Sequence, residues 1–332
     1  MANVLIYTEG GEVGLGHVVR CIHLANALTM RGVEAKFDVP ASNAVGIDRV
    51  RKAGYSLFPS PHRDTIIVDV EQYPGLDNMR YFRENYRRVV LIGGVSYPPA
   101  GELGEYVDLT VYQGELFDAP ESDKVLNGPR YLIIDPRFSE CKPDPNGPIV
   151  VSMGGRDPFD MTDKIQDHMM GLSRDVTFVI GPAYSGNARW INYEKAIFTI
   201  LCQLFEKEID NKTGPEFKYV IVKNSNSLVP YLDGASLAIV TTGMTAYEAL
   251  AARVPALLYN ISPDHERTAR ELHERGAAVN MGLCIESKGD DLTKAIGRIT
   301  PELWRNYSRA GGELVDGLGA GRVADRIMEL AK

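Results

Sequence analysis

The sequence predicts an α/β protein built from two domains. Short apolar runs alternate with amphipathic helical stretches, a pattern typical of a parallel sheet wrapped by helices. The 332 residues exceed the length that one hydrophobic core usually sustains. A polar segment with three prolines and one glycine, Ser139–Pro148, is typical of a crossing between domains. We therefore expect one domain over residues 1–147 and a second over residues 148–332.

The first half begins with a strand, a glycine-rich loop and an amphipathic helix. The strands predicted here are Asn3–Tyr7, Glu34–Val39, Thr65–Val70, Arg88–Ile92 and Leu109–Val111. The first helix is predicted from Gly16 to Met30, because its apolar residues recur at helical spacing. These residues are Val18, Ile22, Ala25 and Leu28.

The second half repeats this alternation without a sequence repeat. Its predicted strands are Ile149–Met153, Val176–Gly181, Lys218–Val222, Leu237–Val240 and Ala256–Tyr259. The segment Trp190–Asp210 fits this pattern poorly, although its apolar residues have helical spacing. It is either an amphipathic helix packed on its own domain or a surface insertion, a lid or an oligomer contact.

Composition and charge exclude several classes of function. A net charge of −8 at pH 7 opposes binding to DNA or RNA, because that binding depends on neutralising phosphates. No run approaches the roughly 20 apolar residues of a membrane span, and the start MANVLIYTEGG lacks a basic signal region. We expect a soluble, cytoplasmic protein. Its four cysteines lack CxxC spacing, so we expect buried thiols and no metal site.

The loop between the first strand and the first helix carries the strongest local signal. It contains Gly14, Gly16, His17 and Arg20. Ligands of a doubly wound sheet bind here, where glycines allow close approach and free helix amides attract an anion or a sugar oxygen. The helix field disfavours an imidazolium, so a neutral His17 is a candidate general base. The alternative is that His17 caps the helix or fills a gap.

Two familiar phosphate-binding loops do not fit this segment. A Walker A loop ends in Gly-Lys-Ser/Thr, which is absent, so ATP hydrolysis is disfavoured. A dinucleotide fingerprint requires a third glycine where Val19 stands, although Asp38 lies at a suitable distance to hold a ribose. The dinucleotide match is therefore partial.

Two further turns, called corners below, follow strands of the second half. Gly154 and Gly155, with Asp157 behind them, either hold a base or phosphate through backbone amides or form an ordinary turn and helix start. Asp264 and His265 lie in a polar loop after a strand, where they either meet sugar hydroxyls or are simply polar loop residues.

A third corner precedes a helix rich in small residues. Thr242, Gly243 and the amides that follow form a potential diphosphate cradle. Glu248 lies one turn into the helix, where its carboxylate can accept hydrogen bonds from both hydroxyls of a ribose. The alternative is a capping box, because Thr245-x-x-Glu248 has that spacing.

Together these turns resemble the GT-B architecture of nucleotide-sugar enzymes, with two Rossmann-like domains facing a central cleft. The resemblance is closest to the UDP-sugar hydrolases of pseudaminic-acid biosynthesis and the related spore-coat polysaccharide proteins, and more distant to the MurG-like glycosyltransferases. It covers nearly the whole chain. The matching residues are Gly14, Leu15, Gly16, His17, Arg20, Asp69, Tyr73, Gly75, Ser152, Met153, Gly154, Gly155, Asp157, Thr242, Gly243, Thr245 and Glu248.

The resemblance implies a role for each matching position. His17 would be the catalytic base that activates water. The substrate-binding residues would be Gly14, Gly16, Arg20, Tyr73, Asp264 and His265. The nucleotide-binding residues would be Gly154, Gly155, Asp157, Thr242, Gly243, Met244, Thr245 and Glu248. The chain departs from the hydrolases at Tyr7–Gly11, where they carry an Arg-Ser-Asp-Ser type of opening.

Three functions are consistent with these expectations. The first is hydrolysis of a UDP-linked amino or deoxy sugar to free sugar and UDP, with no metal and no cofactor. The second is transfer of the sugar from the same donor site to a hydroxyl or amine acceptor. The third is binding of a sugar nucleotide without catalysis. In each case the partner is a small nucleotide-sugar and not a nucleic acid.

Overall fold

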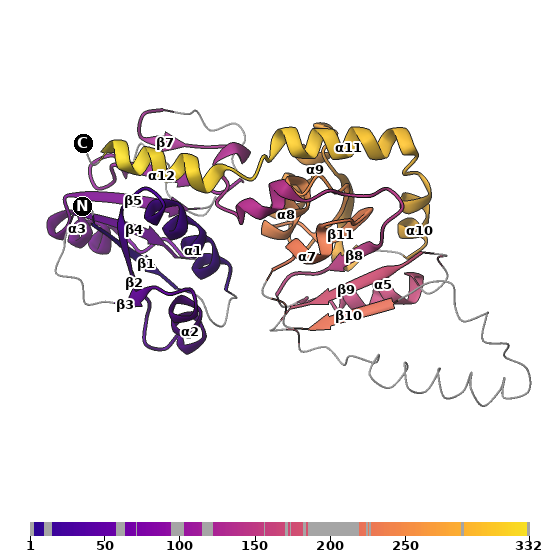
Figure 1. Cartoon of the computed structure of the whole chain (residues 1–332), viewed down its shortest axis with the longest axis horizontal. Helices are drawn as coiled ribbons and strands as arrows, with labels where there is room; N and C mark the ends of the chain where they lie inside the picture. Colours follow the sequence, from indigo (N-terminus) through magenta and orange to yellow (C-terminus); the bar gives the residue numbers. More distant parts are fainter. Residues whose placement is uncertain are drawn as a thin grey trace, which may run out of the picture. The chain divides into compact units, whose positions relative to one another are not determined.

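The protein forms two compact units (Figure 1). The first unit combines Met1–Glu140 with Gly312–Lys332, and the second is Cys141–Gly311. The computed structural model describes residues 3–9, 15–57, 64–70, 72–93, 103–114, 122–155, 157–169, 172, 174–181, 184, 219–223, 225, 227–286 and 289–330. The Trp190–Asp210 segment lies outside these residues, so its predicted role stays a prediction.

The first unit is a parallel sheet in the order β3-β2-β1-β4-β5-β6-β7. Its strands are β1 (Asn3–Thr8), β2 (Glu34–Asp38), β3 (Ser56–Leu57), β4 (Thr65–Asp69), β5 (Arg88–Gly93), β6 (Leu109–Tyr112) and β7 (Val125–Leu126). Its helices are α1 (Gly16–Thr29), α2 (Ala44–Lys52), α3 (Leu76–Asn85) and α12 (Gly319–Leu330), with short 3₁₀ turns at Pro129–Tyr131 and Pro136–Glu140. Parallel neighbours joined by helical crossovers are the arrangement that the alternating pattern predicted.

The two faces of this sheet bury separate apolar clusters. Along β4, Ile67 lies in the cluster under α1 and α12, whereas Ile66 and Val68 lie in the cluster under α3. Alternate side chains of a strand point to opposite faces, so Asp69 at the end of β4 shares the face of Ile67 and α1. This alternation decides which groups Asp69 can meet.

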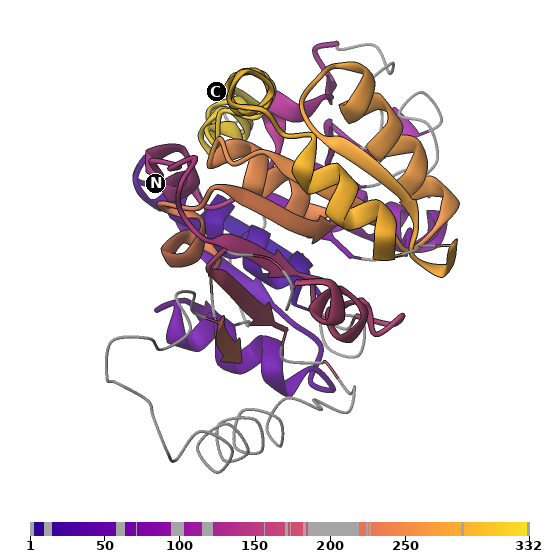
Figure 2. The ribbon, with the colours of Figure 1, turned by 90° about the vertical axis from the view of Figure 1, so that its right-hand side faces the viewer.

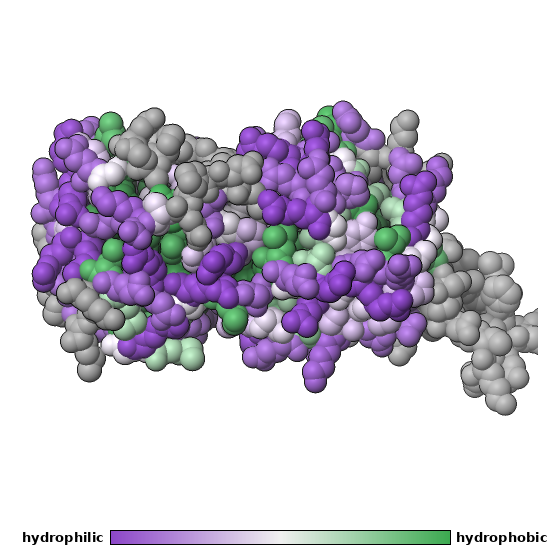
Figure 3. All heavy atoms as spheres, turned by 90° about the horizontal axis from the view of Figure 1, so that it is seen from above, coloured by the Kyte–Doolittle hydropathy of each residue, from purple (hydrophilic) through white to green (hydrophobic). Residues whose placement is uncertain are grey.

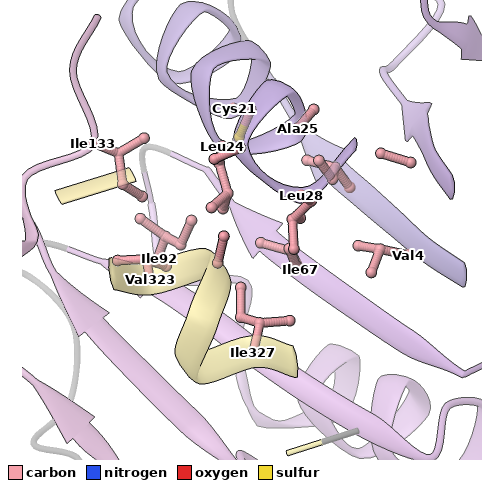
Figure 4. Packing of buried hydrophobic residues seen from close by; sticks show 14 of the residues in the cluster. Val4, Cys21, Leu24, Ala25, Leu28, Ile67, Ile92, Ile133, Val323 and Ile327 are labelled. Carbon is pink, nitrogen blue, oxygen red and sulfur yellow. The ribbon is translucent and has the colours of Figure 1, made fainter. Parts of the chain in front are cut away.

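The C-terminal helix α12 completes the cluster over α1. Val323 and Ile327 of α12 are buried with Leu24 and Leu28 of α1 and with Ile67 of the sheet (Figure 4). The expected division at residue 148, with all later residues in the second domain, is therefore corrected. The compact units divide at Glu140, and residues 312–332 pack in the first unit because the apolar face of α12 is buried there.

The second unit is also a parallel sheet, in the order β10-β9-β8-β11-β12-β13, and helices lie on both of its faces (Figure 2). Its strands are β8 (Ile149–Ser152), β9 (Val176–Ile180), β10 (Tyr219–Lys223), β11 (Leu237–Thr241), β12 (Ala256–Asn260) and β13 (Val279–Leu283). Its helices are α5 (Met161–Met169), α7 (Val229–Leu232), α8 (Met244–Ala251), α9 (Pro263–Glu274), α10 (Gly289–Gly297) and α11 (Pro301–Leu314), with a 3₁₀ turn at Cys284–Glu286.

The strands predicted from the sequence are confirmed, and both ends of each lie within one residue of the observed ends. Three strands were missed, namely β3, β7 and β13. The first two have only two residues each, and β13 contains Asn280 and Gly282, so none of them forms a continuous apolar run. The predicted burial of the thiols is confirmed for Cys21, Cys141 and Cys284.

Apolar side chains are concentrated inside the two units. The face of the protein in Figure 3 is mainly hydrophilic, with apolar residues in small scattered groups. Within the described part of the chain, no helix has both the length and the apolar character needed to cross a membrane.

The substitution Ile327→Ala tests the contribution of α12 to the first unit. Ile327 is almost completely buried, so we expect the first unit to lose about 2–5 kcal/mol of stability through lost burial and the cavity left behind. Hydrogen exchange should become faster in β1 and β4 and stay unchanged in β11. Glu329→Ala, on the exposed side of the same helix, is the control. Equal acceleration in both units would contradict the assignment of α12 to the first.

Candidate functional site

The first candidate site lies where β1 and β4 end and α1 begins. Thr8, the last residue of β1, pairs in register with Asp69, the last residue of β4. The chain that leaves β1 leads into α1, which starts at Gly16. Asp69 faces α1 because it shares the face of Ile67. Residues far apart in sequence are thus brought together at one edge of the sheet.

Asp69 is completely buried and is bonded to three side chains of α1. His17 Nδ1 lies 2.7 Å from Asp69 Oδ1, and Arg20 Nε donates to Oδ2 at 2.6 Å. Arg20 Nη2 also donates to Oδ1, and the Cys21 thiol donates to Oδ2 at 3.2 Å. Burial would raise the pKa of Asp69, but the charge and hydrogen bonds of Arg20, with those of His17, outweigh it and lower the pKa to about 2.

The ionised Asp69 determines which nitrogen of His17 carries a proton. A carboxylate only accepts hydrogen bonds, so the contact requires the proton of the neutral ring on Nδ1 and leaves the lone pair on Nε2. The His17 side chain is 25% exposed, and no side chain caps α1, whose N-cap is Leu15. The alternative in which His17 caps the helix is therefore wrong. The arrangement provides an oriented imidazole that can accept a proton.

The other predicted residues of this loop have different surroundings. Gly16 is the first residue of α1, and Gly14 lies outside the described residues. The Arg20 side chain is directed to Asp69, and its expected contact with the substrate stays a prediction. Tyr73 packs against the apolar cluster under α3, on the face opposite to Asp69, and its expected place beside the sugar stays a prediction.

Sequence reasoning matched Asp69 to a family pattern but gave it no role. The signal was available in part, since an acidic residue at the end of an apolar strand is unusual among buried positions. Its partner could not be read from the sequence, because His17 and Asp69 are 52 residues apart and meet only through the pairing of β1 with β4.

In the second unit, three predicted corners lie at one edge of the sheet. β11 pairs with β8 on one side and with β12 on the other, all in parallel. The corners that follow these strands are therefore neighbours: Gly154–Gly155 after β8, Thr242–Gly243 after β11 and Ser262–His265 after β12. Ligands of open α/β sheets bind outside this edge.

The Gly154–Gly155 corner is shaped by close packing of backbone. Gly154 has a positive φ of 75°, and a Cβ placed on Gly181 would lie 2.3 Å from the carbonyl oxygen of Gly154. A side chain at Gly181 would push this corner away from the end of β9. The glycines thus permit the corner to approach its neighbour closely.

Gly243 is the N-cap of α8 and requires glycine. Its φ of 155° and ψ of −156° lie in a region that residues with a side chain rarely adopt. No side chain caps α8, whose first amides have no acceptor within the helix. Met244 and Thr245 are the first two helical residues, so the capping-box alternative for Thr245 and Glu248 is wrong. The start of α8 can accept an anion.

Thr242 holds this corner in place through a buried network that sequence reasoning missed. Its hydroxyl donates to Asn260 Oδ1 at 2.7 Å, and its amide donates to the Tyr259 carbonyl at 2.9 Å. Asn260 is completely buried and donates through Nδ2 to Asn280 Oδ1 at 2.8 Å and to the Gly282 carbonyl at 2.9 Å. The Thr242 hydroxyl and amide are therefore bonded within the fold. The expected part of Thr242 in holding a nucleotide stays a prediction.

Asp157 is also used internally. Its Oδ1 accepts from the Met161 amide at 2.8 Å and its Oδ2 from the Thr162 amide at 2.7 Å. Both oxygens satisfy the free amides at the start of α5, and the residue is buried. Asp157 thus caps α5, and its expected contact with a nucleotide stays a prediction.

The last predicted pair begins α9. Ser262 caps this helix by accepting from the His265 amide at 3.4 Å, and its hydroxyl lies 2.7 Å from His265 Nδ1. Asp264 is exposed in the first turn. The hydroxyl contact fixes the ring of His265, whereas contacts of this pair with a sugar stay a prediction.

The part of the chain that the structure describes contains no candidate metal site. Among those residues, no group of three or more His, Cys, Asp or Glu side chains is placed to hold a metal ion.

Comparisons with known proteins identify the class of architecture. No model of a protein family matches the sequence. MurG of Acinetobacter baumannii has a similar structure, with a TM-score of 0.64 and 13% identity, over 99% of this chain and 100% of that one. UDP-GlcNAc 2-epimerase of Neisseria meningitidis, bound to UDP-GlcNAc, has a TM-score of 0.62 and 11% identity over 98% of this chain and 100% of that one. The chain has the two-domain GT-B architecture.

Comparison of sequences finds a relative that is similar over nearly the whole chain. The chain is 25% identical to the spore coat polysaccharide biosynthesis protein SpsG of Bacillus subtilis (strain 168), over 99% of this chain and 98% of the relative. The resemblances to the spore-coat polysaccharide proteins and to MurG are both confirmed as resemblances.

The substitution Asp69→Asn tests the buried ion pair. At pH 7 we expect the first unit to lose about 3–5 kcal/mol, because the charge of Arg20 stays buried without its partner. The pKa of Asp69 is lowered, so its contribution to stability is present above its ordinary pKa of 3.8 and is lost as the pH falls towards about 2. The stability difference between the two proteins should therefore shrink from pH 4 to pH 2, measured by urea unfolding monitored through NMR signals of β1 and β4.

The control for this substitution is Asp48→Asn, which removes an exposed carboxylate paired with Lys52 in the same unit. It should change stability by less than about 1 kcal/mol at either pH. A difference between wild type and Asp69→Asn that stays constant over this pH range would show that the carboxylate is not the source of the effect.

The substitution Asn260→Ala tests the network behind the Thr242 corner. It leaves the Thr242 hydroxyl and the Asn280 side chain without their shared partner, at a cost of about 1–3 kcal/mol for each buried group. Hydrogen exchange in β11 and β13 should become faster. The exposed Asn306→Ala on α11 is the matched control. Unchanged exchange in β11 would contradict the role of Asn260.

Proposed function

We propose that the protein hydrolyses a UDP-linked amino or deoxy sugar to the free sugar and UDP. The observation that carries the proposal is the contact between His17 and the buried carboxylate of Asp69. A carboxylate that orients an imidazole through Nδ1 leaves Nε2 able to remove a proton, which is the arrangement of a general base.

The reaction balances with this one base. Nε2 of His17 takes a proton from water while the water oxygen forms a bond to the anomeric carbon. The bond between that carbon and the diphosphate oxygen breaks, and UDP leaves with the electron pair. The positive charge that develops on the imidazole is offset by Asp69, which remains ionised because its pKa is about 2. The base returns to its neutral form when it releases the proton.

In this proposal the second unit holds the nucleotide. The start of α8 provides free amides for the diphosphate, and the conformation of Gly243 brings the backbone into that position. Glu248 lies one turn further, where its partly exposed carboxylate can accept from ribose hydroxyls. Amides at a helix start offset negative charge on a leaving group without a metal.

The comparisons support the proposal from another direction. The relative SpsG is named for spore coat polysaccharide biosynthesis, and its similarity extends over almost the whole chain. The Neisseria meningitidis epimerase, which shares the fold, was solved with UDP-GlcNAc bound. We therefore place the substrate among UDP-linked amino sugars of a polysaccharide pathway.

Glycosyl transfer is the second candidate. Nε2 of His17 can deprotonate an acceptor hydroxyl as readily as water, since the same lone pair does both. Solved structures with this fold include CalG4, the calicheamicin glycosyltransferase, with a TM-score of 0.62. In this case turnover of the donor would appear only after an acceptor hydroxyl or amine is added.

An assay of UDP release from a panel of UDP-linked amino and deoxy sugars tests the proposal. We expect release without any acceptor and in the presence of EDTA. His17→Gln should lower kcat by about 10²–10⁴-fold, the usual contribution of a general base, and leave the Kd for UDP nearly unchanged. Gly243→Ala should instead weaken UDP binding, because alanine does not adopt the backbone conformation of Gly243.

The control is His168→Gln, which removes a histidine in the last turn of α5. It should retain wild-type turnover. UDP release that depends strictly on an acceptor would favour the transferase. Tight UDP binding with no turnover, either with or without an acceptor, would show that the protein binds a sugar nucleotide without catalysis.

A further inference from the structure

Arg20 has contacts that the proposed reaction does not use. Its guanidinium donates to both oxygens of Asp69, through Nε and Nη2. The same Nη2 lies 2.9 Å from His17 Nδ1. The Arg20 side chain is only 12% exposed, so solvent screens this charge weakly. A permanent positive charge is therefore fixed beside the ring of His17.

We propose that Arg20 is a positioning residue that keeps His17 uncharged and directs its free nitrogen outward. This inference rests on the proposed function, in which His17 is the base. A buried carboxylate alone would favour the protonated ring, which cannot accept a proton from water. Arg20 compensates part of the charge of Asp69 and places its own charge beside the imidazole. The His17 ring is then neutral before the reaction and becomes protonated only when it takes the proton from water.

The bidentate contact also fixes the rotation of the carboxylate. Arg20 donates to both oxygens of Asp69, through Nε and Nη2. His17 Nδ1 contacts the same Oδ1 that accepts from Arg20 Nη2. The carboxylate cannot turn away from the ring without breaking a charged hydrogen bond. Nδ1 is thereby held at Asp69, and Nε2 is the nitrogen that remains for the reaction.

The charged and titratable groups around the pair are few among the described residues. α1 contributes Arg20 and the Cys21 thiol, whose pKa is raised well above its usual value mainly by burial and by Asp69. β4 contributes Asp69. On this face of the sheet β1 presents the uncharged Thr8, which lies on the same side of the strand as Ile6 of the cluster under α1. The balance of charge at His17 is thus determined by Arg20 and Asp69.

Two substitutions separate charge from geometry. Arg20→Gln removes the charge but can still donate to the carboxylate, whereas Arg20→Lys keeps the charge and loses the fork. With Arg20→Gln we expect the acidic limb of the kcat/KM profile to move up by about 1–2 pH units, because an unopposed Asp69 favours the protonated ring. With Arg20→Lys we expect that limb to stay near its wild-type pH while kcat falls.

NMR titration of His17 gives a readout that does not depend on turnover. The ¹⁵N shifts of the ring, assigned by comparison with His17→Gln, report its protonation and tautomer. In the wild type we expect a neutral ring with its proton on Nδ1 at pH 7, and in Arg20→Gln a charged ring at the same pH. A neutral ring in Arg20→Gln, or a proton on Nε2 in the wild type, would overturn the inference.

If Arg20→Gln does not fold, Arg20→Lys and the wild type decide by the same titration. Both must then show a neutral ring at pH 7, and a charged ring in either one overturns the inference. If the titrations behave as expected and no UDP-sugar is turned over, the proposed function fails while the role of Arg20 stands. If UDP-sugar is turned over and both variants keep the wild-type pH profile, the function stands and the role of Arg20 fails.

Discussion

The buried carboxylate of Asp69 is the constraint on which the first candidate site depends. An ionised group without solvent must be paired and hydrogen-bonded, and among the described residues its side-chain partners come from α1. Arg20 compensates the charge, and His17 and Cys21 satisfy the remaining acceptor positions. The start of α1 is thereby tied to the end of β4. The orientation of His17 is a consequence of satisfying Asp69.

In the second unit, hydrogen bonds between uncharged groups hold the corner before α8 in place. Asn260 is buried between β11 and β13 and connects Thr242 to Asn280 and Gly282. Amide and hydroxyl groups pair without the desolvation cost of a full charge, but each must still find its partner. The corner before α8 is thus held by neutral hydrogen bonds, and its free amides remain available for an anion. In our proposal this difference matches the chemistry, since the first unit handles a proton and the second an anion.

Several residues that were expected to contact a ligand also hold the candidate corners in place. Asp157 caps α5, Thr242 joins the Asn260 network and Arg20 pairs with Asp69. These positions share one property, which is that their polar atoms are buried. A buried polar atom is satisfied by its own fold first, so a motif position is not by itself a ligand contact. Gly243, Met244 and Glu248 are less enclosed, and their nucleotide-binding roles stay predictions.

The sequence by itself determined the class of fold, the order of most strands and helices, and the loops in which candidate residues lie. It could do so because hydrophobic periodicity and glycine positions are local properties of the chain. Only the tertiary structure decided that Asp69 meets His17, that Asn260 meets Thr242 and that α12 packs against α1. These contacts depend on which strands are neighbours and on which face each residue points to. Strand order and register arise from the packing of the whole chain, and no short segment contains them.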